Sequence, residues 1–139
     1  SNLANTASQI ITHWAGEDPS AAGTWALNQP TGQVKNQAIS SLVSIWFRQD
    51  RDQAAKWVNQ IPDAASRDSA VGGLVNNLRA KPTQALQWAE SIHDEQQRFS
   101  SVRSVILSWK QTAPEKAKAA AERASITPEQ REKLLRSFN

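Results

Sequence analysis

The stretch WAGEDPSAAGTW, from Trp14 to Trp25, decides the fold of this chain. It returns as WFRQDRDQAAKW, from Trp46 to Trp57, with Trp, Asp, Ala and Trp at the same offsets. Three columns extend the pattern: Trp14, Trp46, Leu78 and Trp109; then Trp25, Trp57, Trp88 and Ala120; then Ala22, Ala54, Ala85 and Ala117. Because every column advances by 31 or 32 residues, the chain contains internal repeats.

Each copy contains two segments with the apolar spacing of an amphipathic helix. Before the first column, apolar residues fall at i, i+3, i+4 and i+7. They are Ala7, Ile10, Ile11 and Trp14; Ile39, Leu42, Val43 and Trp46; Val71, Leu74, Val75 and Leu78; and Val102, Val105, Ile106 and Trp109. In the turn that follows, Asp18 can accept from free N–H groups of the next helix, and Pro19 suits the first helical position. Each copy therefore predicts a pair of helices.

We expect an all-α chain, a right-handed α-α solenoid of four helix-pair repeats of about 32 residues and a C-terminal capping helix. The predicted repeats cover 4–32, 33–63, 64–94 and 95–126, and the capping helix covers 128–138, all in one domain of residues 1–139. Thr127 followed by Pro128 predicts the start of that last helix. The Trp pairs should fill the core, so Trp46 and Trp57 are both expected to be largely buried.

The full pattern W-x3-D-P-x2-A-x2-W, at Trp14, Asp18, Pro19, Ala22 and Trp25, resembles the tandem helical repeats of uncharacterised bacterial proteins, which are similar to tetratricopeptide-type helix pairs. The resemblance covers residues 4–125 and implies an α-solenoid without a catalytic activity. Copies three and four depart from the pattern; Leu78 and Ala120 replace Trp, and Lys81 and Ala113 replace Asp. A weaker similarity is to the superhelical, non-catalytic region of soluble lytic transglycosylases.

The composition offers little for catalysis. The 139 residues include no Cys, which excludes disulfides and thiolate chemistry, and only two His, His13 and His93. His13 and Glu17 stand at i and i+4, but two ligands make a poor metal site, and positions at helix ends near free carbonyls explain His13 and His93 better. The nucleotide-binding, hydrolase and metalloprotease motifs that carry glycines or His pairs are missing. We therefore expect no enzyme activity, no cofactor and no metal.

Charge also limits the classes of partner. The net charge is +3, with 5 Lys+Arg against 6 Asp+Glu in residues 1–69 and 11 against 7 in residues 70–139. This excess is small, and the Trp residues lie on apolar faces rather than among basic residues, which disfavours a nucleic-acid partner. No apolar run reaches the length of a bilayer span, so we expect no membrane segment.

Three basic residues recur at one repeat position. Lys35, Arg67 and Arg98 each lie 11 residues before the first column, so stacked repeats would align them along one edge. Such an edge would attract an acidic protein or peptide. The alternative is that each pairs with an acidic residue of the preceding loop, such as Asp63 or Asp94.

Small residues form a second candidate, a stripe on the first helices. Ser41, Gly73 and Ser104 occupy one column with Gln9, and Gly72 lies in the next column with Ser8 and Ser40. Adjacent glycines inside a helix cost about 1 kcal/mol each relative to Ala, so a compensating reason is expected. One reason is the close approach of neighbouring helices; the alternative is the floor of a groove that receives a partner chain.

The sequence thus predicts a protein- or peptide-interaction module without cofactor. The alternatives are a structural spacer, a fragment of a longer repeat array, or the superhelical accessory region of a cell-wall lytic enzyme. The resemblance implies a bacterial protein, either cytoplasmic or exported, and the oligomeric state is left open.

Overall fold

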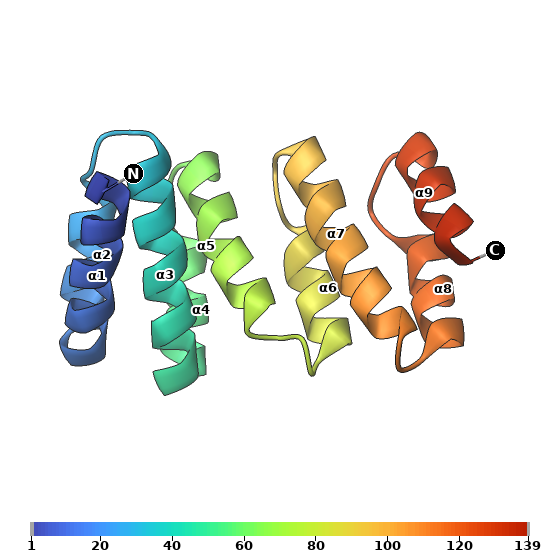
Figure 1. The fold of residues 1–139 in the computed structure, drawn as a ribbon, viewed down its shortest axis with the longest axis horizontal. Coiled ribbons are helices and arrows are strands. Elements are labelled where there is room, and N and C mark those ends of the chain that lie inside the picture. Colours follow the sequence, from blue (N-terminus) through green and yellow to red (C-terminus); the bar gives the residue numbers. More distant parts are fainter. Residues whose placement is uncertain (1, 139) are drawn as a thin grey trace. The chain divides into compact units, whose positions relative to one another are not determined.

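The computed structural model describes the backbone of residues 2–138, with the side chains of residues 1–5, 7, 8 and 139 outside the described part. Ala7 and Ser8, which the repeat pattern includes, therefore lie outside the described side chains. Within residues 2–138 the chain forms nine α-helices, a short 3-10 helix and no strand (Figure 1). They are α1 (Asn2–Glu17), α2 (Pro19–Leu27), α3 (Gln33–Gln49), α4 (Arg51–Gln60), α5 (Ala64–Asn76), α6 (Pro82–Glu90), α7 (Glu95–Lys110), α8 (Pro114–Arg123), α9 (Pro128–Leu135) and η1 (Arg136–Phe138). The all-α prediction is confirmed.

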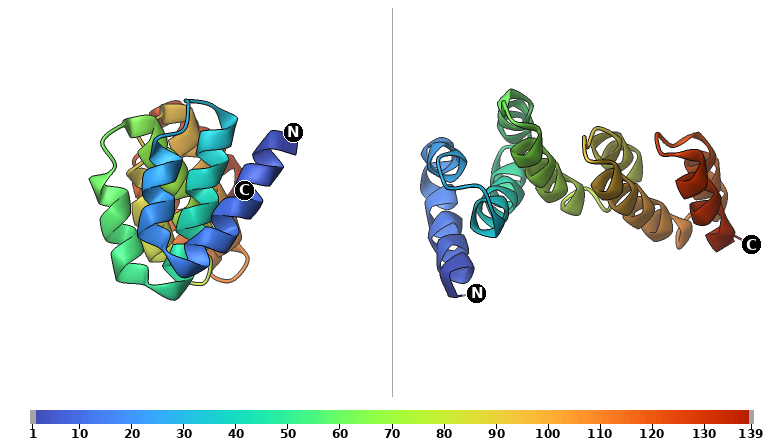
Figure 2. Two further views of the ribbon diagram at one scale, coloured as in Figure 1. Left: turned by 90° about the vertical axis from the view of Figure 1, so that its left-hand side faces the viewer. Right: turned by 90° about the horizontal axis from the view of Figure 1, so that it is seen from above.

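The chain divides into two compact units, residues 1–77 and residues 78–139, and the boundary falls between the two helices of the predicted third repeat. In the first unit α3 packs between α1 and α5, while α2 contacts α1 and α3, and α4 contacts α3 and α5 (Figure 2). In the second unit α7 packs on α6 and α8, and α9 packs on α8. The solenoid, the number of repeats and the single domain stay predictions.

The predicted helix starts are confirmed at the residues that the repeat pattern marks. The Asp18 carboxylate accepts from the Ala21 N–H at 3.1 Å, and Asp50 accepts from Gln53 at 3.2 Å. Thr127 and Gln130 form a reciprocal capping box at the start of α9. Prolines occupy the first position of four helices, Pro19, Pro82, Pro114 and Pro128. These caps satisfy N–H groups that a helix leaves unpaired.

The alanine column lies in the core. Ala22, Ala54, Ala85 and Ala117 are all buried, at 0% or 1% exposure. In the first copy the Trp14 and Trp25 rings lie 6.3 Å apart between centroids, and in the second the Trp46 and Trp57 rings lie 5.7 Å apart. Both pairs are tilted, an arrangement that aromatic rings favour.

The second tryptophan of the central copy is less buried than predicted. Trp46 is 8% exposed, whereas Trp57 is only half-buried. The Trp57 ring lies over Gly23 of α2, where a Cβ would come within 2.8 Å of it. Trp57 thus covers the neighbouring second helix with part of its ring and leaves the rest in solvent. Close approach explains why Gly23 carries no side chain.

Candidate functional site

The three recurring basic residues are engaged within their own units. Lys35 is half-buried near the start of α3, and its charge contributes to lowering the pKa of Asp63, after the larger effect of the hydrogen bonds from Ser66. The Arg67 guanidinium donates to Asn59 Oδ1 at 3.3 Å, which joins α5 to the end of α4. Lys35 and Arg67 lie in the first unit and Arg98 in the second, so the structure describes no common edge for the three.

Arg98 bonds to backbone rather than to an acidic side chain. Its Nη1 donates to the Ile92 carbonyl at 3.0 Å and to the His93 carbonyl at 3.5 Å, both in the loop before α7. The sequence-based alternative named Asp94 as the partner, but the Asp94 carboxylate accepts from the Gln97 N–H as the cap of α7. The guanidinium therefore holds the α6–α7 loop against the helix that follows it.

Arg131 repeats this arrangement at the start of α9. Its Nη2 donates to the Ala124 carbonyl at 2.9 Å and to the Ile126 carbonyl at 3.3 Å. Arg98 and Arg131, which we call the loop arginines, each stand four positions after the residue that caps their helix, Asp94 and Thr127 respectively. The Nε atoms of both are buried. The sequence reasoning missed Arg131 because its repeat position lies beyond the fourth copy. The spacing of cap and arginine was the available signal, and Arg67, four positions after Asp63, shares it while donating to Asn59.

The small-residue stripe has different surroundings at each position. Gly73 is buried where α5 crosses α3, and a Cβ there would lie 2.6 Å from the Ser40 carbonyl oxygen. Ser41 is half-buried, while Ser104 is exposed on α7. At Gly72 a Cβ would project into open space, with no atom of another helix within 4 Å. Close approach of helices therefore accounts for Gly73 but not for Gly72.

Polar groups next to Gly73 join α3 to α5. Ser44 Oγ donates to the Gly73 carbonyl at 3.3 Å, and the Asn77 amide donates to the Ser44 carbonyl at 3.3 Å and to the Gly73 carbonyl at 3.0 Å. Such bonds require the two backbones to stay close. At the previous crossing, a Cβ on Gly16 of α1 would lie 3.9 Å from Gln49 Nε2 of α3. Gly73 and Asn77 thus mark the face that α5 turns to α3, and Gln49 marks the face that α3 turns to α1.

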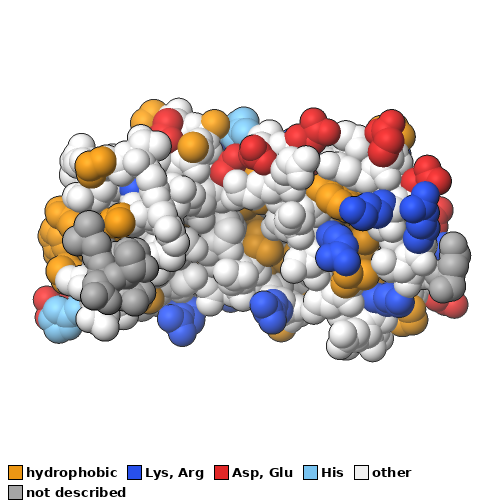
Figure 3. Space-filling model, turned by 45° about the horizontal axis from the view of Figure 1, so that its top comes forward, with side chains coloured by type: hydrophobic (Ala, Val, Ile, Leu, Met, Phe, Trp, Pro, Cys, Tyr) orange, Lys and Arg blue, Asp and Glu red, His pale blue; other side chains and the backbone are white. Residues whose placement is uncertain are grey.

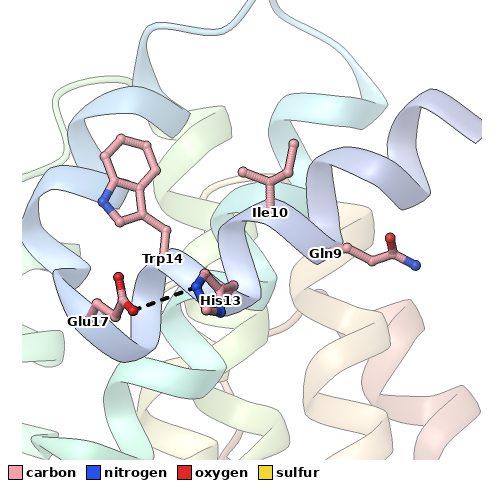
Figure 4. Close-up of a pocket in the computed structure, with 5 residues that line it drawn as sticks. All are labelled: Gln9, Ile10, His13, Trp14 and Glu17. Carbon is pink, nitrogen blue, oxygen red and sulfur yellow. Dashed lines mark ion pairs between the residues drawn. The ribbon is translucent and has the colours of Figure 1, made fainter.

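The corresponding residues of α1 line a shallow hollow. Counting back by 32 per repeat, Gly73 corresponds to Gln9, Asn77 to His13 and Gln49 to Glu17. The hollow is lined by these three residues with Ile10 and Trp14, a set that we call the open face of α1 (Figure 4). Among the described residues Ile10 is the one large apolar side chain that is exposed, at 51%. Its counterparts Leu42 and Leu74 are fully buried.

The charges of the open face lie at one end of it. His13 Nε2 and Glu17 Oε1 are 3.6 Å apart, and both side chains are mostly in solvent, at 82% and 70% exposure (Figure 4). An exposed pair of this kind contributes little to stability, so both groups stay available to another molecule. No group of three or more His, Cys, Asp or Glu suited to a metal occurs among the described residues.

Charged side chains are more numerous in the second unit. Residues 78–139 carry 11 Lys+Arg and 7 Asp+Glu, and many of them are visible on the helices of this unit in Figure 3. Residues 1–77 carry 5 and 6. Within the described part of the chain, no helix has the length and apolar character needed to cross a bilayer.

Comparison of the chain with protein-family models, with curated proteins and with solved structures finds no match. The resemblance to tandem bacterial helical repeats, and the weaker one to lytic transglycosylases, therefore stay expectations from the sequence.

Proposed function

We propose that this chain is a non-catalytic scaffold for binding a protein or peptide. In this proposal the four helix pairs and the capping helix form a right-handed, tetratricopeptide-like solenoid of bacterial origin. It binds without cofactor, metal, nucleic acid or membrane. Repeats of this kind stack through one face of each helix, and any such face without a neighbour is a surface on which another chain can pack.

The observation that carries the proposal is the open face of α1. The corresponding face of α3 packs on α1, and the corresponding face of α5 packs on α3. On α1 it presents an exposed Ile10 and a half-buried Trp14 beside two ionisable side chains. Apolar surface with a polar rim is the composition of protein-binding patches, and aromatic residues are enriched there.

The residues proposed from sequence differ in what they can offer a partner. Ser104 is exposed, and the side chains of Lys35, Arg67 and Ser41 are half-buried. Contact of these four residues with an acidic partner chain remains part of the proposal. Arg98 and Gly73 are engaged inside the fold, by the Ile92 and His93 carbonyls and by Ser40. Their contacts support a structural role for both.

The second candidate is a spacer or a fragment of a longer repeat array, which includes the accessory region of a lytic enzyme. The open face of α1 favours this candidate too, because another helix pair placed before α1 would cover Ile10 and Trp14. The two candidates differ in what the isolated chain does. A scaffold binds a partner saturably, whereas a spacer binds none.

The test uses the purified 139-residue chain as immobilised bait, with an unrelated helical protein of equal size and charge as control. Proteins that only this chain retains are identified, purified and titrated by calorimetry. Saturable binding with fixed stoichiometry supports the scaffold. Retention by both baits alike, or no saturable binding, excludes it and leaves the spacer. A titration series in salt shows whether charge contributes to binding, because screening weakens the attraction between opposite charges. A Lys35→Glu and Arg67→Glu double variant then shows whether the partner is acidic, because only an acidic partner loses affinity for it.

A further inference from the structure

We infer that the open face of α1 binds one amphipathic α-helix of a partner chain, with small residues at i and i+4, an apolar residue at i+3 and a basic residue at i+8. This inference rests on the proposed scaffold function and specifies its partner. The helix crosses α1 in the orientation in which α3 crosses α5, but at a wider separation because Gln9 stands where Gly73 stands. Its apolar residue lies near Ile10 and its basic residue beside Glu17.

The two crossings inside the first unit define this pattern. At the α3–α5 crossing, Ser40 and Ser44 of the earlier helix meet Gly73 and Asn77 of the later one. With α1 as the later helix, Gln9 and His13 replace Gly73 and Asn77. Both replacements are larger, so the two backbones lie farther apart than at the α3–α5 crossing, and small residues at the positions of Ser40 and Ser44 leave room for the Gln9 and His13 side chains.

The basic residue follows from the α1–α3 crossing. There Gly16 of the earlier helix lies opposite Gln49 of the later one. When α1 is the later helix, Glu17 stands in the place of Gln49. The residue opposite Glu17 then belongs to the incoming helix and lies eight positions after the first small residue of that helix. A carboxylate with 70% of its side chain exposed favours a cation there. In α3 the same position is Arg48, so α3 itself carries the whole pattern at Ser40, Val43, Ser44 and Arg48.

A second copy of the chain fits this surface less well. A copy stacked end to end on α1 would present α9, which follows α8 as α3 follows α2 and is eight residues long. Aligned through Arg131 and Arg98, α9 has Arg136 at the position of Ser40. An arginine at this position takes up the room that the Gln9 and His13 side chains need. A separate amphipathic helix with a small residue at this position leaves that room.

The experiment uses the full chain and a fluorescent synthetic peptide with the sequence of residues 33–49, which carries the pattern. Fluorescence anisotropy measures its Kd. We expect saturable binding that Ile10→Asp weakens about tenfold or more, because a carboxylate in the apolar contact is left unpaired. Glu17→Lys should weaken binding about two- to fivefold, and a peptide with Arg48→Glu should restore it to that variant. Glu122→Lys on the exposed side of α8 is the matched control and should bind as the parent does.

Circular dichroism checks that each variant is folded. If Ile10→Asp does not fold, Glu17→Lys still tests the site, because it changes a solvent-exposed side chain. The inference is overturned if the peptide does not bind saturably, or if binding is unchanged by Ile10→Asp and Glu17→Lys. It is also overturned if sedimentation shows self-association that Ile10→Asp abolishes, because the occupant is then a second copy. If partners from the bait experiment bind Ile10→Asp like the parent, the scaffold function stands and this site does not.

Discussion

The carbonyl oxygen of Ser40 on α3 occupies the space where a side chain on Gly73 of α5 would begin, since a Cβ at Gly73 would lie 2.6 Å from it. The next Cβ contact, with Val43, would be 3.3 Å. The obstacle is backbone, which cannot rotate away as a flexible side chain can. One residue earlier, Gly72 has open space at the same position.

The two adjacent glycines should therefore respond in opposite directions to alanine. Gly73→Ala should lower the free energy of unfolding by about 1 to 3 kcal/mol, because α3 and α5 must move apart. Gly72→Ala should raise it by about 0.5 to 1 kcal/mol, because alanine favours the helix and has room. Urea unfolding of both variants measures the difference. Equal effects of one sign would show that α5 does not pack on α3 in this way.

The core tryptophan should matter more than its partner. Trp46 is 8% exposed, so Trp46→Ala should cost about 3 to 5 kcal/mol in unfolding free energy, as large core aromatics do. Trp57→Ala should cost less because that ring is half in solvent. Thermal and urea unfolding of the two variants gives the comparison. A Trp46→Ala protein that melts like the parent would place this residue at the surface and make it a binding candidate.

The cap of α5 should make stability depend on pH. Hydrogen bonds from Ser66 lower the pKa of Asp63 below its ordinary 3.8, helped by the charge of Lys35. A lowered pKa in the folded state contributes stability above pH 3.8, which is lost as the pH falls through the folded value. Asp63→Ala should thus cost about 0.5 to 2 kcal/mol at pH 7 and progressively less below pH 4. Urea unfolding of parent and variant from pH 7 to pH 2.5 checks this; a difference independent of pH would contradict it.

Much of the helical architecture follows from periodic residues, but the surface does not. The alanine column and the caps Asp18, Asp50 and Thr127 depend on contacts within one helix pair, so a repeated pattern reports them. Periodicity also places Ile10 with Leu42 and predicts that it is buried. Ile10 is exposed because its burial depends on whether another helix packs on this face of α1, and the apolar pattern of a single helix does not show that.

Recurrence likewise does not separate binding residues from structural ones. Arg98 and Lys35 recur at a single position, yet the Arg98 guanidinium bonds to loop carbonyls, and a sequence does not show where a long side chain turns. Arg131 has the same bonds but no place in the four-repeat alignment. The spacing from the helix cap places both loop arginines near the loop, because the fourth residue of a helix lies above the loop that leads into it. Arg67 has the same spacing after Asp63 and donates to Asn59, so the spacing alone does not give the partner.

The loop arginines should accordingly contribute to stability. Arg98→Met keeps the apolar part of the side chain but removes the bonds to the Ile92 and His93 carbonyls, and a hydrogen bond from a charged group contributes about 1.5 to 3 kcal/mol. We expect a loss of that order in urea unfolding, and a similar loss for Arg131→Met. Arg103→Met, at an exposed position of the same α7 helix, is the control and should change stability by less than about 0.5 kcal/mol. If Arg98→Met is as stable as Arg103→Met, the carbonyl bonds contribute nothing, and Arg98 becomes again a candidate for binding an acidic partner.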